Sequence, residues 1–167
     1  HLSIRRQRQM CIRDSFKHRA QVLAINQEAD LCLMHVWGFF EKPLRISKKR
    51  PKKGQKVYSM AAPGGIFQKN MVSYFEGRYS GPYKHHRFGD KILYNMPVMF
   101  GMSGAPILNE KGSLIGIISA GNMRFHHIML GTTYAETVKF ILYSIKRDVR
   151  RRLGDKAPKK LFNVKFE

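Results

Sequence analysis

The chain has 167 residues, of which 43% are hydrophobic and 25% charged, a balance typical of a globular protein with one domain or two small half-domains. Its 31 lysines and arginines against 11 aspartates and glutamates give a net charge of +20, which predicts attraction to polyanions but does not bear on the fold. No apolar run approaches the roughly eighteen residues of a membrane span, and two cysteines are too few for a disulfide scaffold or a four-cysteine zinc site.

The first fifteen residues have an unusual composition. The stretch from Arg5 to Asp14 is basic, lacks hydrophobic periodicity, and matches the translation of a transposon adapter used in sequencing libraries. A disordered basic arm is the alternative, but we expect residues 1–15 to be an adapter-derived scar and exclude them from the fold. On this interpretation Cys11 is not native, Cys32 has no intrachain disulfide partner, and the natural chain extends upstream of Phe16.

Short strands alternate with turns through most of the remaining chain. The pattern predicts strands at residues 20–25, 31–36, 56–61, 71–76, 91–96 and 113–119, the last in a hairpin with 107–108. Residues 79–87, with Gly81, Pro82 and a histidine pair, are typical of a loop, and the basic segment Lys48–Lys53 is typical of a linker. Turns at intervals of about ten residues favour an all-β sandwich or barrel.

One helix is expected near the C-terminus, at residues 134–153. Thr133 and Glu136 form a capping box, and the apolar residues that follow have helical spacing (Val138, Ile141, Leu142, Ile145, Val149). Basic residues near the end suit the helix dipole, and Gly154 can end the helix. Residues 154–167 form a tail without a clear pattern.

The strongest chemical signal is a serine between glycines, in the segment Gly101-Met102-Ser103-Gly104-Ala105-Pro106. A nucleophilic serine needs an exposed hydroxyl on a tight turn and backbone N–H groups that point to the developing oxyanion. Flanking glycines allow the backbone angles of such a turn. The serine is followed by a hairpin rather than a helix, which distinguishes it from the nucleophile elbow of α/β-hydrolases.

This segment resembles the nucleophile segment of trypsin-like serine proteases, whose usual form is Gly-Asn/Asp-Ser-Gly-Gly-Pro followed by a hairpin. Met102 and Ala105 depart from that form, and neither position supplies a side chain to the chemistry. Three further segments are similar to the same family: Ala24–Met34 around Asp30, Gly54–Gly65, and Gly131–Ala135. Together the matches cover residues 16–153.

The resemblance implies a role for each matching residue. Ser103 would be the nucleophile, Asp30 would orient and stabilise the catalytic histidine, and the N–H groups of Gly101 and Ser103 would form the oxyanion hole. Substrate would lie against Pro97, Phe100, Ser119, Ala120, Gly121 and Gly131. Because no acidic residue lies near Pro97, we expect a preference for a small or apolar residue rather than lysine or arginine before the scissile bond.

The catalytic histidine is not found at the expected place in the chain. In the His–Asp–Ser order of this family it precedes the aspartate by several dozen residues, but His18 lies only twelve residues before Asp30. The later pairs His85-His86 and His126-His127 follow Asp30, and adjacent histidines point to opposite faces of a strand, so we expect no metal site. We expect the histidine upstream of the sequence and little triad activity in this fragment alone.

The resemblance implies a chymotrypsin-like fold of two antiparallel β-barrels with a C-terminal α-helix. We expect residues 16–47 to be the remnant of an incomplete N-terminal barrel, 48–53 to be a basic linker, and 54–133 to form the C-terminal barrel, against which the helix packs. The expected activity is peptide hydrolysis on a protein or peptide substrate, without a cofactor. Cys32 as the single native cysteine is compatible with a reducing cytoplasm.

A second hypothesis is an inactive module with a protease fold that binds nucleic acid or another polyanion. Its support is the net charge and two basic clusters, Lys48–Lys53 and Lys146–Arg152. The alternative is that these clusters are only solvent-exposed faces without a ligand. Aromatic residues do not interleave with these clusters in a recognised RNA-binding motif. A viral protease that processes proteins near nucleic acid would combine both hypotheses.

Overall fold

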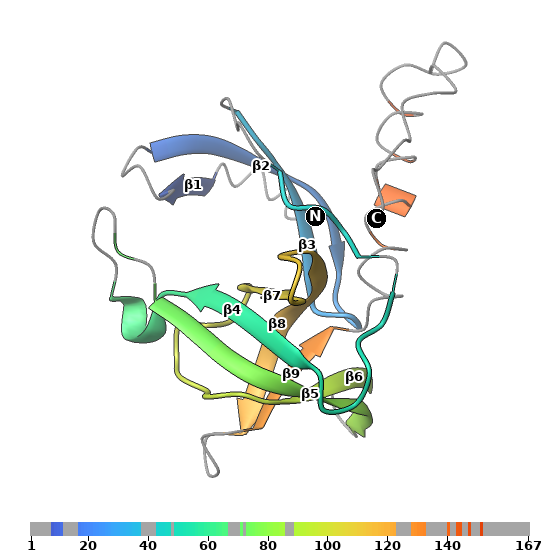
Figure 1. Ribbon diagram of the computed structural model, residues 1–167. Helices are drawn as coiled ribbons and strands as arrows, with labels where there is room; N and C mark the ends of the chain where they lie inside the picture. The colour runs from blue at the N-terminus through green and yellow to red at the C-terminus, as the bar shows by residue number, and fades with distance from the viewer. Residues whose placement is uncertain are drawn as a thin grey trace.

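The computed structural model describes residues 8–11, 17–37, 43–47, 49–66, 71, 73–85, 89–122 and 128–132, and the single residues Phe140, Tyr143, Ser144, Arg147 and Arg151 (Figure 1). The described elements are β1 (Arg8–Cys11), β2 (Lys17–Asn26), β3 (Leu31–Val36), β4 (Lys56–Ala61), the 3₁₀ turn η1 (Pro63–Gly65), β5 (Ser73–His85), β6 (Gly89–Asn95), β7 (Pro106–Leu108), β8 (Leu114–Asn122) and β9 (Ile128–Thr132).

The strands form a three-stranded sheet and a closed barrel, which Figure 1 shows one above the other. The sheet has the order β1-β2-β3, and the barrel has the order β4-β5-β6-β9-β8-β7, closed by pairing of β4 with β7. Neighbouring strands are antiparallel throughout. The prediction of an all-β, chymotrypsin-like fold is therefore confirmed, with the second barrel complete.

The expected adapter segment contributes a strand to the sheet. β1 pairs with β2 in the register Arg8 to Ala20 and Cys11 to Lys17. Backbone pairing does not depend on the origin of the residues, so the adapter origin of residues 1–15 stays a prediction.

The predicted loop at residues 79–87 is wrong for its described part. β5 is a single strand of 13 residues that continues through Gly81 and Pro82 to His85, and it pairs with β6 from Arg78 to His85. A register shift between Tyr79 and Gly81 marks a bulge, where Gly81 takes a φ of 136°. Glycine and proline indicate a turn in the sequence, but a bulge also accommodates them within a strand.

The barrel interior holds the core of the molecule. Among the described residues, the buried cluster includes Val57, Tyr94, Met96, Ile107 and Met129, each at most 1% exposed. The Tyr79 and Tyr94 rings pack edge to face with centroids 5.8 Å apart. Burial raises the pKa of the Tyr94 hydroxyl well above its usual range, and the neighbouring Tyr79 adds to the shift. A rigid aromatic core beneath the loops fixes the positions from which they start.

The segment between the sheet and the barrel is attached to the barrel at both ends. On one side, Ser47 N–H donates to Leu114 O at 2.9 Å and Leu114 N–H donates to Arg45 O at 2.7 Å. On the other, Gly54 N–H donates to Tyr79 O at 2.8 Å. The predicted linker thus follows the barrel surface between two backbone anchor points.

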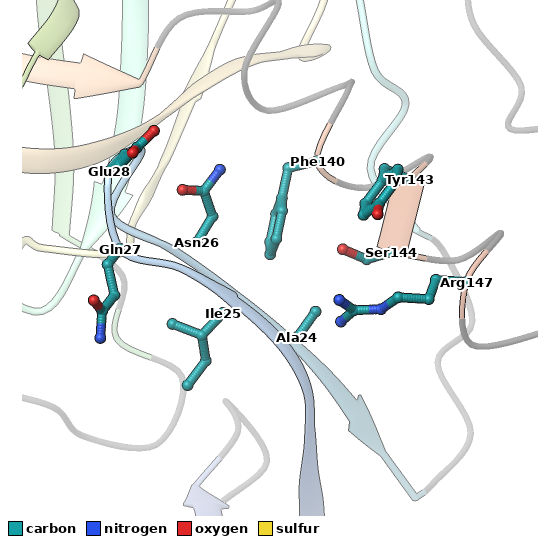
Figure 2. A pocket seen from close by; sticks show the side chains of 9 residues that line it. All are labelled: Ala24, Ile25, Asn26, Gln27, Glu28, Phe140, Tyr143, Ser144 and Arg147. Carbon is teal, nitrogen blue, oxygen red and sulfur yellow. The ribbon is translucent and has the colours of Figure 1, made fainter. Parts of the chain in front are cut away.

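The C-terminal helix predicted at residues 134–153 lies almost entirely outside the described residues. Four of its residues that are described, Phe140, Tyr143, Ser144 and Arg147, line a cavity of about 420 Å³ together with residues 24–28. Figure 2 shows Phe140, Ser144 and Arg147 facing the end of β2. We expect the helix to pack against the second barrel, but these side chains lie against the first sheet. No helix within the described part of the chain is long and apolar enough to cross a membrane.

Candidate functional site

Ser103 lies at the exposed tip of the loop that joins β6 to β7. Two hydrogen bonds attach the loop to β8: Gly104 N–H donates to Ile118 O at 2.8 Å, and Ile118 N–H donates to Ala105 O at 2.9 Å. Ala105 N–H also donates to Met102 O at 3.1 Å, which closes a tight turn around Ser103. Met102 itself is only 1% exposed. Ser103 is therefore exposed on a tight turn, and hydrogen bonds hold the backbone of the residues on either side of it.

Gly101 is required by both its backbone angle and its surroundings. Its φ of 88° lies in the left-handed region, and a Cβ there would lie 2.5 Å from Ala62 O and 3.0 Å from Gly65 N. The η1 turn thus packs directly on the serine loop, and Gly64 N–H donates to Phe100 O at 2.6 Å. No other amino acid fits this position without movement of one of the two loops.

The N–H groups of Gly101 and Ser103 lie on the turn that carries the exposed serine. Among the described residues, no backbone carbonyl accepts a hydrogen bond from either group. Backbone N–H groups held on a fixed turn beside an exposed hydroxyl can stabilise negative charge at that point. The sequence predicted this pair as the oxyanion hole, and the described geometry is compatible with that role.

Asp30 lies at the end of the turn between β2 and β3. It is exposed and has a φ of 56°, and its N–H donates to Gln27 O at 3.4 Å. Within the same turn, Ala29 N–H donates to Asn26 Oδ1 at 3.1 Å. The turn belongs to the three-stranded sheet, whereas Ser103 belongs to the barrel. No contact between Asp30 and Ser103 is found among the described residues, so their joint role stays a prediction.

A buried lysine connects the Asp30 turn to the barrel. Lys91 on β6 is 1% exposed, and its Nζ donates to Ala29 O at 3.0 Å. The sequence pattern gave no sign of this contact, because a lysine within a strand is typically on the solvent face. Lys91 therefore fixes the residue next to Asp30 relative to the half of the molecule that carries Ser103.

We predict that Lys91→Met lowers the free energy of unfolding by about 1–3 kcal/mol, because the buried Ala29 carbonyl loses its charged donor. Urea unfolding of the two proteins measures the difference. Lys84→Met on β5 is the matched control, since Lys84 is exposed and its loss should change stability by less than about 0.5 kcal/mol. Equal stability of the Lys91 variant and the parent would contradict this role.

The predicted substrate residues lie on two sides of the serine loop. Ser119, Ala120 and Gly121 belong to β8, where Ala120 pairs with Leu130 and Gly121 with Met129 of β9. Ser119 Oγ donates to Leu130 O at 3.4 Å. In the described part of the chain no strand pairs with the other edge of this stretch, because β7 pairs with β8 only up to Ile117. An open strand edge beside an exposed serine can accept an extended peptide.

The remaining predicted substrate residues differ in exposure. Pro97 and Phe100 are exposed on the β6–β7 loop, and Phe100 is 75% exposed. Gly131 is buried, and a Cβ there would lie 2.6 Å from Ile107 Cδ1 and 2.9 Å from Tyr94 Cε2. Its close neighbours are thus core residues of the barrel.

Val98 is a candidate residue that the sequence did not single out individually. It is 7% exposed, and its side chain occupies the space that a Cβ on Gly121 would need. It thus fills the region between the β6–β7 loop and the open part of β8. The sequence alone could not have indicated this contact, because Val98 and Gly121 are distant in the chain and become neighbours only in the fold.

His35 is the histidine whose side chain is described, and it contacts neither Asp30 nor Ser103 among the described residues. His35 on β3 packs on Trp37 with ring centroids 4.6 Å apart, and Arg19 lies 5.6 Å from the same Trp37 ring. His18 lies on β2 opposite Met10, and His85 ends β5. His86, His126 and His127 lie outside the described residues. Within the described residues, no group of three or more His, Cys, Asp or Glu could hold a metal ion.

Comparison with known proteins gives one family and several structural neighbours. The profile of the trypsin-like peptidase domain matches residues 4–117. The solved structure of the HtrA-type protease AlgW with a decapeptide is similar over 83% of this chain and 44% of its own, with 17% identity and a TM-score of 0.72. The Rv3671c protease of M. tuberculosis in its active form is similar over 75% of this chain and 58% of its own, with 17% identity and a TM-score of 0.66. No curated protein sequence matches. The chain thus spans about half the length of these two structures.

Proposed function

The chain belongs to the family of trypsin-like peptidase domains, and we propose that the complete protein is a serine endopeptidase with Ser103 as its nucleophile. The observation that carries this proposal is the serine loop itself. An exposed hydroxyl lies between two glycines of positive φ, on a turn fastened to β8, with the N–H groups of Gly101 and Ser103 unused by described carbonyls. That arrangement suits a nucleophile beside an oxyanion hole.

The proposed reaction is acyl transfer in two steps. A histidine removes the proton from Ser103 Oγ as that oxygen attacks the substrate carbonyl carbon, and Gly101 and Ser103 N–H donate to the resulting oxyanion. The histidine then protonates the leaving amine as the C–N bond breaks, which leaves an ester on Ser103. Water attacks the ester and gives one proton to the histidine. The histidine then returns that proton to Ser103 Oγ as the ester bond breaks, which releases the new carboxyl terminus and restores the enzyme.

Asp30 would orient this histidine and stabilise its protonated form. The turn that carries Asp30 is held by Lys91 through the neighbouring Ala29 carbonyl, which supports a fixed position for the carboxylate. We place the histidine before Asp30 in the chain, since this is the order of the triad in the family.

The proposed substrate is an extended peptide that adds to the open edge of β8 at Ser119–Gly121. The similar AlgW structure was solved with a decapeptide. Because Val98 fills the space against Gly121, the pocket for the residue before the scissile bond should be small. We therefore propose cleavage after alanine or glycine rather than after leucine or phenylalanine.

Peptide hydrolysis by the complete protein tests both the function and the preference. We predict that kcat/KM is higher for alanine than for leucine before the scissile bond, and that Val98→Ala improves the leucine substrate by about tenfold relative to alanine. Val57→Ala removes the same methyl groups from the core at β4 and should leave the preference unchanged. Absence of hydrolysis for every peptide would overturn the function, whereas hydrolysis with an unchanged preference in Val98→Ala would overturn only the pocket.

A further inference from the structure

A second pocket lies on the surface between the basic linker and the β7–β8 hairpin. Its volume is about 360 Å³, and five of the residues that line it are charged: Lys49, Arg50, Lys52, Glu110 and Lys111. The linker and the hairpin are about sixty residues apart in the sequence. The basic cluster that the proposed function leaves unexplained is thus one wall of a cavity, and Lys111 completes it from the opposite wall.

Both walls of the pocket are held in place by hydrogen bonds. On the linker side, Lys52 N–H donates to Gln55 Oε1 at 3.0 Å, and Ser47 Oγ donates to Lys49 O at 3.0 Å. On the hairpin side, Asn109 Oδ1 accepts from Lys111 N–H at 3.0 Å and from Ser113 N–H at 2.9 Å. Fixed backbones reduce the ordering cost of binding a ligand between them.

The charge around the pocket is strongly positive. Four cationic side chains face one carboxylate, and all five residues are exposed. None of the four cations forms an ion pair with a carboxylate among the residues that the structure describes. Like charges gathered around one cavity repel each other unless an anion lies between them. The pocket is therefore complementary to a ligand with several negative charges.

We propose that this pocket binds a short chain of linked phosphate groups. The cavity is several times larger than one phosphate group, and lysine and arginine are the side chains that bind phosphate oxygens best. No aromatic residue lines the pocket, so bases have no stacking surface and the phosphates alone would be recognised. Either a free inorganic oligophosphate or the backbone of a nucleic acid can present such a chain.

The test is a calorimetric titration of the 167-residue chain with inorganic tripolyphosphate, carried out at low and at physiological salt. We expect binding that weakens with salt, and a Kd raised about fivefold by Lys111→Gln or Arg50→Gln. Lys84→Gln removes the same charge from β5 outside the pocket and should change the Kd by less than about twofold. Glu110→Gln should lower the Kd by about two- to threefold.

A decathymidine titration separates the two sources of phosphate. Binding of tripolyphosphate alone with the expected variant pattern supports a free oligophosphate, and binding of both probes with that pattern supports a nucleic-acid backbone as well. The proposal is overturned if neither probe binds at low salt. It is also overturned if Lys111→Gln and Lys84→Gln weaken binding equally, because the attraction then comes from net charge alone. Glu110→Gln removes the repulsion between a carboxylate and the phosphates and should strengthen binding. This gain cannot be explained by a folding defect, unlike the weaker binding expected for the variants of basic residues.

Discussion

Replacing Ser103 with alanine is expected to lower kcat for peptide hydrolysis by the complete protein on the order of 10⁴- to 10⁶-fold. The hydroxyl is the atom that forms and breaks the acyl bond, so no neighbouring group can replace it. Removal of an exposed hydroxyl from a loop tip should leave folding unchanged. The rate of hydrolysis of a peptide with alanine before the scissile bond measures the effect on kcat. Thermal unfolding measures the effect on stability.

Ser80→Ala is the matched control for this experiment. Ser80 is also exposed, but it lies on β5, and its loss should leave kcat and stability at the parent values. If Ser103→Ala retains more than about one hundredth of the parent rate, Ser103 is not the nucleophile. Equal losses in both variants would instead indicate damage to the fold.

The second large effect is expected from Gly101→Ala. A Cβ at this position would lie 2.5 Å from Ala62 O, so the serine loop or the η1 turn has to move. Movement of the loop takes the N–H groups of Gly101 and Ser103 away from the oxyanion. Loss of one such donor lowers kcat by about 10²- to 10³-fold. We expect KM to change much less, since these groups act mainly on the transition state.

Gly112→Ala is the control that separates the strain of a left-handed backbone angle from the displacement of the serine loop. Gly112 has a φ of 74°, but a Cβ there would meet nothing within 4 Å. Its replacement should cost about 1 kcal/mol of stability without loss of kcat, because only the left-handed angle is disfavoured. If Gly101→Ala keeps the parent kcat, the loop does not form the oxyanion hole in the proposed way.

The sequence predicted the local features of the serine loop and the positions of most strands along the chain. Glycines on both sides of Ser103 indicate a tight turn with positive φ angles, and the structure gives Gly101 and Gly104 φ values of 88° and 86°. The succession of short strands and turns likewise predicted the strands at 20–25 and 31–36, which lie within β2 and coincide with β3. These signals come from neighbours in the chain, so one sequence is enough to read them.

Features that depend on distant contacts could not be predicted in this way. The contact of Lys91 with Ala29 joins residues of two different sheets, and Val98 fills the space against Gly121 across two segments. β5 continues through Gly81 and Pro82 because β6 pairs with it on the far side of the bulge. In each case tertiary packing overrides or replaces the local preference.

The most direct test of the central claim is covalent labelling of the complete protein with a serine-directed phosphonate, followed by peptide mapping. Mass spectrometry should find the phosphonyl group on the peptide that contains Ser103, with no label on Ser103→Ala. Labelling should also fall strongly in Gly101→Ala, since the phosphonyl oxygen uses the same N–H donors. A protein that hydrolyses peptides but carries the label on another serine, or carries none, would contradict the assignment of Ser103.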